Sequence, residues 1–454
     1  MPFTLPATGR DTADILAEVT ALAEGENQAW EDGRCSGTMY CGDFDHYEFM
    51  ADVFAKFGHA NALQRDMCPS ATQFEGGIID MTLDMLGANG MPEGSDPVGM
   101  VTSGGSGSIL HAVLAYREAA TARGITTPNF LRPETAHPAF DKACHLLGIE
   151  LRNVPVDPDT TKVDLDLLRS AIDTNTIAMV GSACNYPYGT IDPIGEMGQL
   201  ALEHEIGLHV DGCLGGFILP WGRELGYPIE AFDLSVPGVT TISADTHKYG
   251  YAYKGTSVLV FADRALRNGQ YFYRTDWTGG KYFSPGIDGS RSVGLLAATW
   301  ASMVKLGREG YLDYARQIFE TADRMKALVE SHEELRIVGD PTFCFSFTSD
   351  AFDIYHVNDH LSQLGWRLNG QQYPNAIHMA VTRPQTRPGV VEQFGADLAD
   401  GVEYARTAGE QQAFSGAVYG GVAGGLNEEA DLFIKSVLED MMDDMQAVPS
   451  PTAS

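Results

Sequence analysis

The chain has 454 residues and carries 61 acidic side chains against 30 lysines and arginines, a formal net charge of −31. This balance counts against nucleic acid or an anionic membrane as the main partner, because such surfaces are bound largely through lysine and arginine. Hydrophobic residues make up 44% of the chain, which excludes a disordered protein and is ordinary for a globular one.

The cysteines and the chain start bear on location. Seven scattered cysteines, odd in number and without a C-x-x-C pair, fit a reducing compartment and offer no zinc-binding spacing. No apolar run approaches the ~20 residues that span a bilayer. The first ten residues also lack the basic end and apolar stretch of a secretion signal. We therefore expect a soluble cytoplasmic protein without a transmembrane anchor or a bound metal.

Helical and strand patterns alternate through most of the chain. A first helix is predicted over 11–30, where Ile15, Val19 and Leu22 recur at helical spacing. From about residue 50 to 325, helices are predicted at 107–122, 137–147, 164–172 and 193–205. Buried parallel strands are predicted at 177–181, 207–211, 239–243 and 257–261. Such alternation predicts a mostly parallel sheet covered by helices on both faces.

The pattern changes near residue 326. Strands are predicted at 335–338 and 343–347, a helix at 354–364, a strand pair at 366–370 and 376–382, and then helices to about 446. We expect three regions: an N-terminal helical segment, 1–55, a large α/β domain, 56–325, and a smaller C-terminal α+β domain, 326–454. The stretch 392–444, with 12 acidic and 2 basic residues, is expected on an outer surface.

A Gly/Ser turn before a helix is the first candidate site. In VTSGGSGSIL (101–110), the free N–H groups and the helix dipole form a possible anion site around Ser103, Gly105 and Ser106. The segment fits neither the dinucleotide G-x-G-x-x-G pattern nor the P-loop pattern. By itself it is equally typical of a plain turn.

Three further candidates follow predicted strands or open a helix. Asp211 ends the strand 207–211, at the edge where α/β proteins bind ligands, although it could simply cap the next turn. Lys248, preceded by His247, follows the strand 239–243, and a desolvated lysine can form a Schiff base, although most lysines lie on the surface. His137 opens the helix 137–147 and, alone, is typical of a partly buried histidine.

Together these residues meet the needs of pyridoxal 5'-phosphate. Ser103, Gly105 and Ser106 would hold the cofactor phosphate, His137 would stack on the ring, and Asp211 would pair with the pyridinium nitrogen. Lys248 would form the Schiff base, with His247 beside it. The joint pattern is far more specific than any of its parts, so we predict a pyridoxal phosphate enzyme.

The sequence resembles the sphingosine-1-phosphate lyase family of group II decarboxylases. The resemblance runs from about residue 35 to 425 and rests on HPAFDK (137–142), IDPI (191–194), HVDGCLGGF (209–217), ISADTHKYGY (242–251) and DWTGG (276–280). It implies a fold type I enzyme and a homodimer with two active sites at the subunit interface. The implied reaction is retro-aldol cleavage of a phosphorylated long-chain base to phosphoethanolamine and a fatty aldehyde.

The resemblance also implies a substrate site. SGTMY (36–40) matches the family, so Tyr40 is a candidate contact of the polar head. The general base that takes the C3-hydroxyl proton is open among Lys248, Tyr40 and the cofactor phosphate. Asn61, Lys254 and Arg291 match positions expected on the substrate phosphate or the cofactor loop. Tyr186 and Tyr188 match a segment that reaches into the partner subunit's site, and which of the two does so is open.

Departures from the family pattern leave the substrate open. Gln64 stands where the family has histidine, and glutamine cannot carry charge or relay a proton. Tyr253 replaces a proline, and Ser106 and Gly107 replace a Thr-Glu pair. Alternatives are an amino-acid decarboxylase of the same superfamily, a lyase for another phosphorylated amino alcohol, or a non-catalytic pyridoxal phosphate-binding regulator.

The charge of the chain is unevenly distributed. Residues 240–291 hold seven Lys/Arg and four Asp, so the region around Lys248 could bind phosphates despite the acidic chain.

Overall fold

The computed structural model describes residues 5–409, 413–421 and 427–446. Two predictions fall partly outside the described residues. The absence of a secretion signal is predicted from a segment that includes residues 1–4, and the predicted small domain includes residues 447–454.

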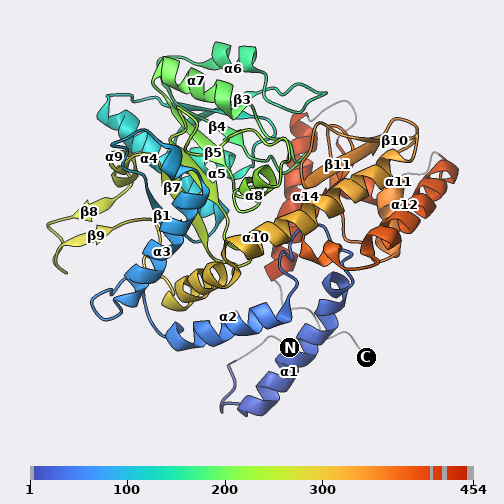
Figure 1. The fold of residues 1–454 in the computed structure, drawn as a ribbon, viewed down its shortest axis with the longest axis horizontal. Helices are drawn as coiled ribbons and strands as arrows, with labels where there is room; N and C mark the ends of the chain where they lie inside the picture. The colour runs from blue at the N-terminus through green and yellow to red at the C-terminus, as the bar shows by residue number, and fades with distance from the viewer. Residues whose placement is uncertain (1–4, 410–412, 422–426, 447–454) are drawn as a thin grey trace.

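A seven-stranded sheet forms the centre of the larger part (Figure 1). Its order is β1-β7-β6-β5-β4-β2-β3. The strands are β1 (Val98–Thr102), β2 (Asn129–Pro133), β3 (Glu150–Val154), β4 (Thr176–Ser182), β5 (Gly207–Asp211), β6 (Thr241–Ala244) and β7 (Ser257–Phe261). The apolar runs of β4, β5, β6 and β7 are buried on both faces, as expected for a covered sheet, whereas the edge strand β3 is only partly buried.

Six of the seven strands run in one direction. β7 is antiparallel to both of its neighbours, β6 and β1. The expectation of a parallel strand at 257–261 is therefore wrong. β7 follows β6 through residues 245–256, which contain no crossover helix, and a chain that returns without a crossover pairs antiparallel. The mostly parallel, mixed α/β sheet is confirmed.

Helices cover both faces of this sheet. On one face, α4 (Gly105–Ala122) packs with α5 (Ala139–Leu147), and both enclose a buried cluster around Phe130. A second buried cluster contains side chains of β4, β5 and β6 together with those of the helices on the opposite face. The remaining helices of this part are α3 (Ser70–Met85), α6 (Leu165–Ala171), α7 (Ile194–His204), α8 (Leu219–Glu224) and α9 (Arg264–Asn268).

A second, four-stranded antiparallel sheet lies toward the C-terminus, as expected for a smaller α+β unit. Its order is β10-β11-β13-β12. The elements of this part are β10 (Leu335–Ile337), β11 (Cys344–Ser349), α11 (Tyr355–Gln363), β12 (Asn369–Gln371), β13 (Ala376–Ala380), η2 (Arg383–Thr386), α12 (Val390–Thr407) and α13 (Phe414–Tyr419).

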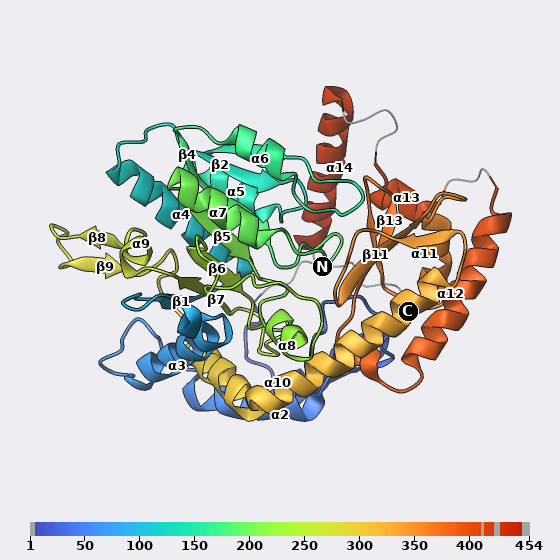
Figure 2. The same ribbon diagram turned by 45° about the horizontal axis from the view of Figure 1, so that its top comes forward.

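The long helix α10 (Val293–Glu330) joins the two parts (Figure 2). It breaks at Gly307, whose φ of 58° lies in the left-handed region that glycine tolerates. α10 crosses the predicted boundary at residue 325, so the division into domains at 55 and 325 stays a prediction.

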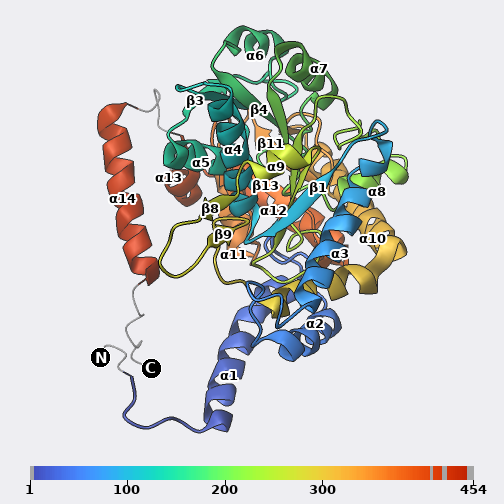
Figure 3. The same cartoon turned by 90° about the vertical axis from the view of Figure 1, so that its left-hand side faces the viewer.

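Several elements lie at the periphery. These are α1 (Thr12–Glu31), α2 (Phe44–Phe57), η1 (Ala88–Gly90), the hairpin of β8 (Phe272–Arg274) and β9 (Tyr282–Ser284), and α14 (Glu428–Gln446). The hairpin projects from the body in Figure 1, and α14, which has no buried residue, stands along one side in Figure 3. Among the described residues, no helix combines the length and apolar character needed to cross a bilayer.

Candidate active site

The carboxyl ends of the parallel strands converge on one cavity of about 500 Å³. β1 leads into the turn at Ser103, β5 ends at Asp211, and β6 is followed by Asp245 and Lys248. Because parallel strands end at the same sheet edge, residues far apart in sequence meet there. The predicted residues that line this cavity are Tyr40, Ser103, Gly105, Ser106, His137, Tyr186, Asp211, His247 and Lys248.

Asp211 lines the cavity and is only 7% exposed. One carboxylate oxygen, Oδ1, accepts hydrogen bonds from the backbone N–H of Cys213 at 3.0 Å and from the hydroxyl of Ser243 at 3.3 Å. His137 lines the cavity as well, and its Nδ1 accepts a hydrogen bond from the N–H of Ala139 at 3.1 Å. A carboxylate and an imidazole ring are thus both held in place beside the same space.

The amino end of α4 opens into the cavity without a side-chain cap. Gly104 has a φ of 149°, a backbone conformation that favours glycine. A Cβ atom at Gly105 would lie 2.8 Å from a carboxylate oxygen of Asp245 and 2.9 Å from the sulfur of Cys213, so only glycine fits. The free N–H groups of this turn, the positive end of the helix dipole and the hydroxyl groups of Ser103 and Ser106 suit a phosphate.

Lys248 forms an ion pair inside the cavity. Its Nζ lies 3.0 Å from Oδ2 of Asp245. Burial acts to lower the pKa of Lys248, but the charge of Asp245, followed by Tyr40, outweighs burial, and the pKa is raised. Asp245 is 2% exposed, and its other oxygen has no hydrogen-bond partner among the described residues. This unpaired, buried oxygen beside an open cavity is typical of a site built around a further polar group.

Lys254 and Tyr40 form a cation–π pair beside Lys248, which we call the cationic corner. The Lys254 ammonium lies 4.6 Å from the centre of the Tyr40 ring and donates to the carbonyl oxygens of Thr38 at 3.1 Å and His247 at 3.4 Å. Lys254 is exposed as a residue, but partial desolvation of its ammonium and the charge of Lys248 lower the pKa of Lys254 to about 8. Burial raises the pKa of Tyr40 to about 12, so its hydroxyl stays protonated at neutral pH.

The two candidate tyrosines, Tyr186 and Tyr188, lie in different places. Tyr186 lines the cavity, and its ring centre lies 4.3 Å from that of His378 in β13. The Tyr188 hydroxyl instead donates to the carbonyl oxygen of Tyr373 at 3.1 Å, in a separate cavity that Tyr186 also borders. Within one chain, Tyr186 therefore belongs to the site and Tyr188 does not.

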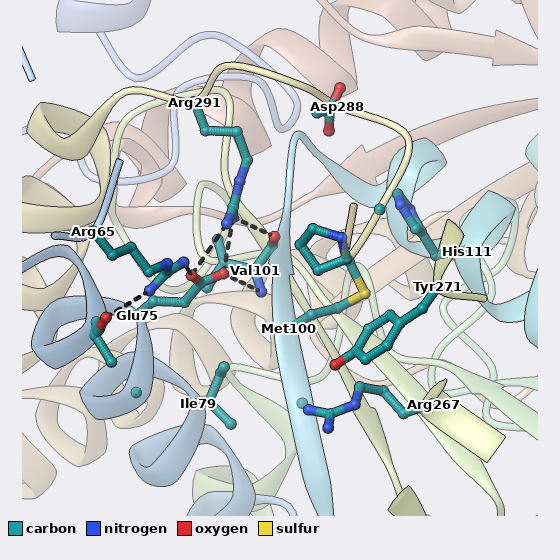
Figure 4. Close-up of a pocket in the computed structure, with 15 residues that line it drawn as sticks. Arg65, Glu75, Ile79, Met100, Val101, His111, Arg267, Tyr271, Asp288 and Arg291 are labelled. Carbon is teal, nitrogen blue, oxygen red and sulfur yellow. Dashed lines mark hydrogen bonds and ion pairs between the residues drawn. The ribbon is translucent and has the colours of Figure 1, made fainter. Parts of the chain in front are cut away.

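Asn61, Gln64 and Arg291 lie outside the cavity within one chain. Asn61 donates to the Ser290 hydroxyl at 2.9 Å, and Gln64 is exposed. Figure 4 shows Arg291 beside Glu75 in a second cavity of about 330 Å³. Its guanidinium binds the Glu75 carboxylate at 2.8 Å and the carbonyl oxygen of Val101 at 3.0 Å. In a single chain, Arg291 is thus engaged by a buried carboxylate.

Some cavity residues were not predicted from the sequence. These are Gly107, Ile109, Ser182, Cys184, Asn185, Cys213, Leu214 and Asp245. Ser182 ends β4 as Asp211 ends β5, and Asp245 follows directly on β6. The position of a polar residue at the end of a parallel strand is therefore the signal that could have found Ser182 and Asp245.

The residues present fit pyridoxal phosphate. The uncapped, glycine-only turn of α4 suits the phosphate, the buried carboxylate of Asp211 suits the ring nitrogen, and Lys248 lines the same cavity. This fit depends on the arrangement of the donors and not on any one motif.

Comparisons with known proteins agree with this chemistry. The model of the pyridoxal-dependent decarboxylase conserved domain matches residues 1–347. A sphingosine-1-phosphate lyase of Dictyostelium discoideum is 42% identical over 402 residues, which are 88% of this chain and 74% of the relative. The solved structure of a sphingosine-1-phosphate lyase from Burkholderia pseudomallei is 50% identical, with a TM-score of 0.92 over 99% of this chain and 98% of that one. A glutamate decarboxylase of Lactobacillus brevis, 20% identical with a TM-score of 0.76 over 90% of this chain and 96% of that one, shares the fold.

Proposed function

Because the chain belongs to the sphingosine-1-phosphate lyase family of pyridoxal-dependent decarboxylases, we propose that it cleaves a phosphorylated long-chain base. The enzyme is a pyridoxal phosphate-dependent carbon–carbon lyase. The C2–C3 bond breaks in a retro-aldol reaction, and the products are phosphoethanolamine and a fatty aldehyde. The observation that carries this proposal is the cationic corner of Lys254 and Tyr40 beside the Lys248 and Asp211 cavity.

The cofactor residues have separate tasks in this reaction. When bound, pyridoxal phosphate supplies an electron sink for the bond that breaks. Asp211 would hold the ring nitrogen, and the free N–H groups at the start of α4 would hold the phosphate, with Ser103 and Ser106. His137 and His247 border the same space, where they would restrict the orientation of the ring. Restricting the ring selects which substrate bond is aligned for cleavage.

The substrate phosphate is proposed to bind at Lys254. An ammonium group next to the cavity provides a positive charge for an anion, and Tyr40 fixes its direction through a cation–π contact. The region near Lys248 carries the excess of positive charge already noted in residues 240–291. The phosphate would therefore lie at the Tyr40 side of the cavity, with the rest of the base directed outward.

Lys248 is the residue we assign to proton transfer from the C3 hydroxyl. Its Nζ, once free, can accept a proton, and Asp245 at 3.0 Å stabilises the resulting charge. Tyr40 suits the role of a hydrogen-bond donor, because its raised pKa keeps its hydroxyl protonated. We therefore assign Lys248 as the general base, because the negative charge of Asp245 stabilises its protonated form.

A substrate panel tests the proposed reaction. We expect the purified enzyme with pyridoxal phosphate to release a fatty aldehyde from sphingoid-base phosphates and no CO2 from amino acids. Release of CO2 from an amino acid, with no aldehyde from any phosphorylated base, would instead assign a decarboxylase. Aldehyde from only short phosphorylated amino alcohols would shift the substrate class and retain the reaction. No turnover at all despite a bound cofactor would favour a regulator.

We also propose a homodimer whose two active sites are shared. Asn61, Gln64 and Arg291 lie outside the cavity of their own chain, which supports their use in the cavity of a second one. The β8–β9 hairpin exposes Phe272, Trp277 and Phe283 by 59%, 56% and 72%. Large exposed aromatic groups on one projecting element are typical of an interaction surface.

Mixing inactive variants tests the shared site. Lys248→Ala and Asn61→Ala chains, refolded or co-expressed together, should regain activity, because a mixed dimer contains one intact site. Lys248→Ala mixed with Tyr40→Phe is the matched control, since both residues line the same cavity of one chain and no site is restored. Equal behaviour of the two mixtures, or a monomer in sedimentation, would exclude the shared dimer.

A cytoplasmic location is the last part of this proposal. All seven cysteines lie in the described part of the chain and none forms a disulfide. Reduced thiols are typical of the cytoplasm. Fractionation of the producing cells would test the location directly.

A further inference from the structure

A buried histidine lies behind Asp211. His209 precedes Asp211 by two positions on β5, and alternate residues of a strand point to the same side. Its Nε2 lies 3.1 Å from the Ser243 hydroxyl oxygen, and that hydroxyl lies 3.3 Å from Oδ1 of Asp211. His209 and Ser243 are both 0% exposed, so no solvent competes for these contacts.

The same histidine is held from its other nitrogen. Nδ1 lies 2.7 Å from the Thr241 hydroxyl, and Thr241 lies 2.5 Å from the hydroxyl of Tyr116 in α4. The register of β5 against β6 pairs His209 with Thr241 and Asp211 with Ser243. The hydrogen-bond chain thus runs from α4 through two strands to the carboxylate, and we call Tyr116, Thr241, His209 and Ser243 the relay.

The direction of each hydrogen bond follows from the protons available. A carboxylate only accepts, so Ser243 donates to Asp211 and must itself accept from Nε2–H of His209 and from the thiol of Cys213 at 3.2 Å. Burial lowers the pKa of His209 to about 4, so the ring is neutral and its Nδ1 carries no proton. Nδ1 therefore accepts from Thr241, which accepts from Tyr116.

We propose that His209 is a positioning residue, which acts through Ser243 to hold Oδ1 of Asp211 as an acceptor and to leave Oδ2 for the cofactor's ring nitrogen. The proposal rests on the role proposed for Asp211. The fixed order of donors means that the carboxylate cannot rotate without breaking the Ser243 and Cys213 hydrogen bonds together. The charged or titratable groups facing the relay are Asp211, Cys213 and Tyr116, and the Phe140 ring packs against His209 at 5.6 Å.

The test compares His209→Leu with His209→Gln. Leucine removes both hydrogen bonds, whereas the glutamine amide can donate toward Ser243 and accept from Thr241. Loss of a hydrogen bond to a charged group should lower kcat, or weaken cofactor binding by the apoprotein, about 10- to 100-fold. KM should change little, because His209 does not line the cavity. The visible band of the bound cofactor should also change its pH dependence in His209→Leu, and His209→Gln should restore most of each property.

Two controls accompany this test. The first separates the effect of lost packing from that of the relay, and the second tests the role of Asp211 by itself. His46 is also buried, with hydrogen bonds to the Tyr251 carbonyl and the Ser302 hydroxyl, so His46→Leu imposes a similar loss away from the site. It should destabilise the fold without changing the spectrum. Asp211→Asn should abolish activity. If Asp211→Asn keeps wild-type activity, the role of Asp211 is refuted. If His209→Leu keeps wild-type activity while Asp211→Asn is inactive, only the relay is refuted.

The other possible outcomes also test the relay. If His209→Gln loses as much as His209→Leu, the ring acts by its shape and the relay is refuted. If His209→Leu does not fold, Ser243→Ala carries the test, because it removes one hydroxyl from between His209 and Asp211. Ser243→Ala with wild-type cofactor affinity, kcat and band profile would overturn the proposal.

Discussion

The ammonium nitrogen of Lys248 lies 3.0 Å from a carboxylate oxygen of Asp245, three positions earlier in the chain. Asp245 is almost completely buried, at 2% exposed, whereas the Lys248 side chain is 24% exposed, and the pair sits where the turn of α4 approaches so closely that residue 105 must be glycine. A buried carboxylate keeps its charge at a high cost unless it is paired. The pair therefore links the charge state of the reactive lysine to the shape of the phosphate site.

Asp245→Asn should move cofactor uptake to lower pH. Asp245 is the main group that raises the pKa of Lys248, while burial acts to lower it, so removal of the carboxylate charge leaves burial dominant. More of the lysine is then neutral at a given pH, and the neutral amine is the nucleophile. The rate at which the apoprotein develops the visible cofactor band, measured against pH, should show a lower midpoint. An unchanged midpoint would mean that Asp245 does not control Lys248.

Lys254→Ala should weaken binding of phosphorylated substrates selectively. Loss of a charge-assisted hydrogen bond to a phosphate should raise KM about 10- to 100-fold. An unphosphorylated analogue should be affected little. Lys254→Arg, which keeps the charge, is the matched control and should retain much of the affinity. Equal effects of Lys254→Ala on both substrates would place the phosphate elsewhere.

The same lysine predicts an alkaline limit of activity. Its pKa in the free enzyme is lowered to about 8, so the positive charge is present below this pH and is lost as the pH rises through it. The value of kcat/KM for a phosphorylated substrate should therefore fall about tenfold per pH unit above this point, since it follows the free enzyme's ionisations. This limb should disappear in Lys254→Ala. A limb that persists there belongs to another group.

Gly105→Ala should damage the phosphate site. The added Cβ would meet the buried carboxylate of Asp245 and the sulfur of Cys213 at less than 3 Å. Overpacking of this kind costs about 1–3 kcal/mol, so apoprotein affinity for pyridoxal phosphate should fall about tenfold or more. Gly195→Ala, in α7 with no atom within 4 Å of the added Cβ, is the control. It should bind cofactor normally and stabilise the fold by up to about 1 kcal/mol.

Two buried histidines predict acid-sensitive stability. Burial lowers the pKa of His209 and of His378 to about 4, below the ~6.5 of an unfolded chain. The unfolded state therefore binds more protons below pH 6.5, and stability present above that pH is lost as the pH falls toward 4. Each histidine should cost about 2 kcal/mol between pH 7 and 5. Urea unfolding at both pH values measures this loss, and His378→Gln should remove about half of the histidine contribution.

The local motifs predicted much of the site from the sequence. Asp211 ends one apolar run, Lys248 follows another by four positions, and the turn at Ser103 to Ser106 precedes a helical pattern. Such signals depend on neighbouring residues, so they can be read without the fold. The direction of β7 could not be read in this way, because its apolar run is the same whether the chain crosses over or turns back.

The sequence by itself determined the family, the cofactor and the residues that end each strand at the ligand-binding edge. The tertiary structure decided which of these residues meet. It placed Tyr186 and not Tyr188 in the cavity, engaged Arg291 with Glu75 outside it, and put His209 behind Asp211. These contacts join segments tens to hundreds of residues apart, and they depend on strand order and register. Burial is the largest influence on the pKa of Lys248 and of Lys254, and it comes from this packing, although the charges of Asp245 and Lys248 that also act on them lie within six positions in the sequence.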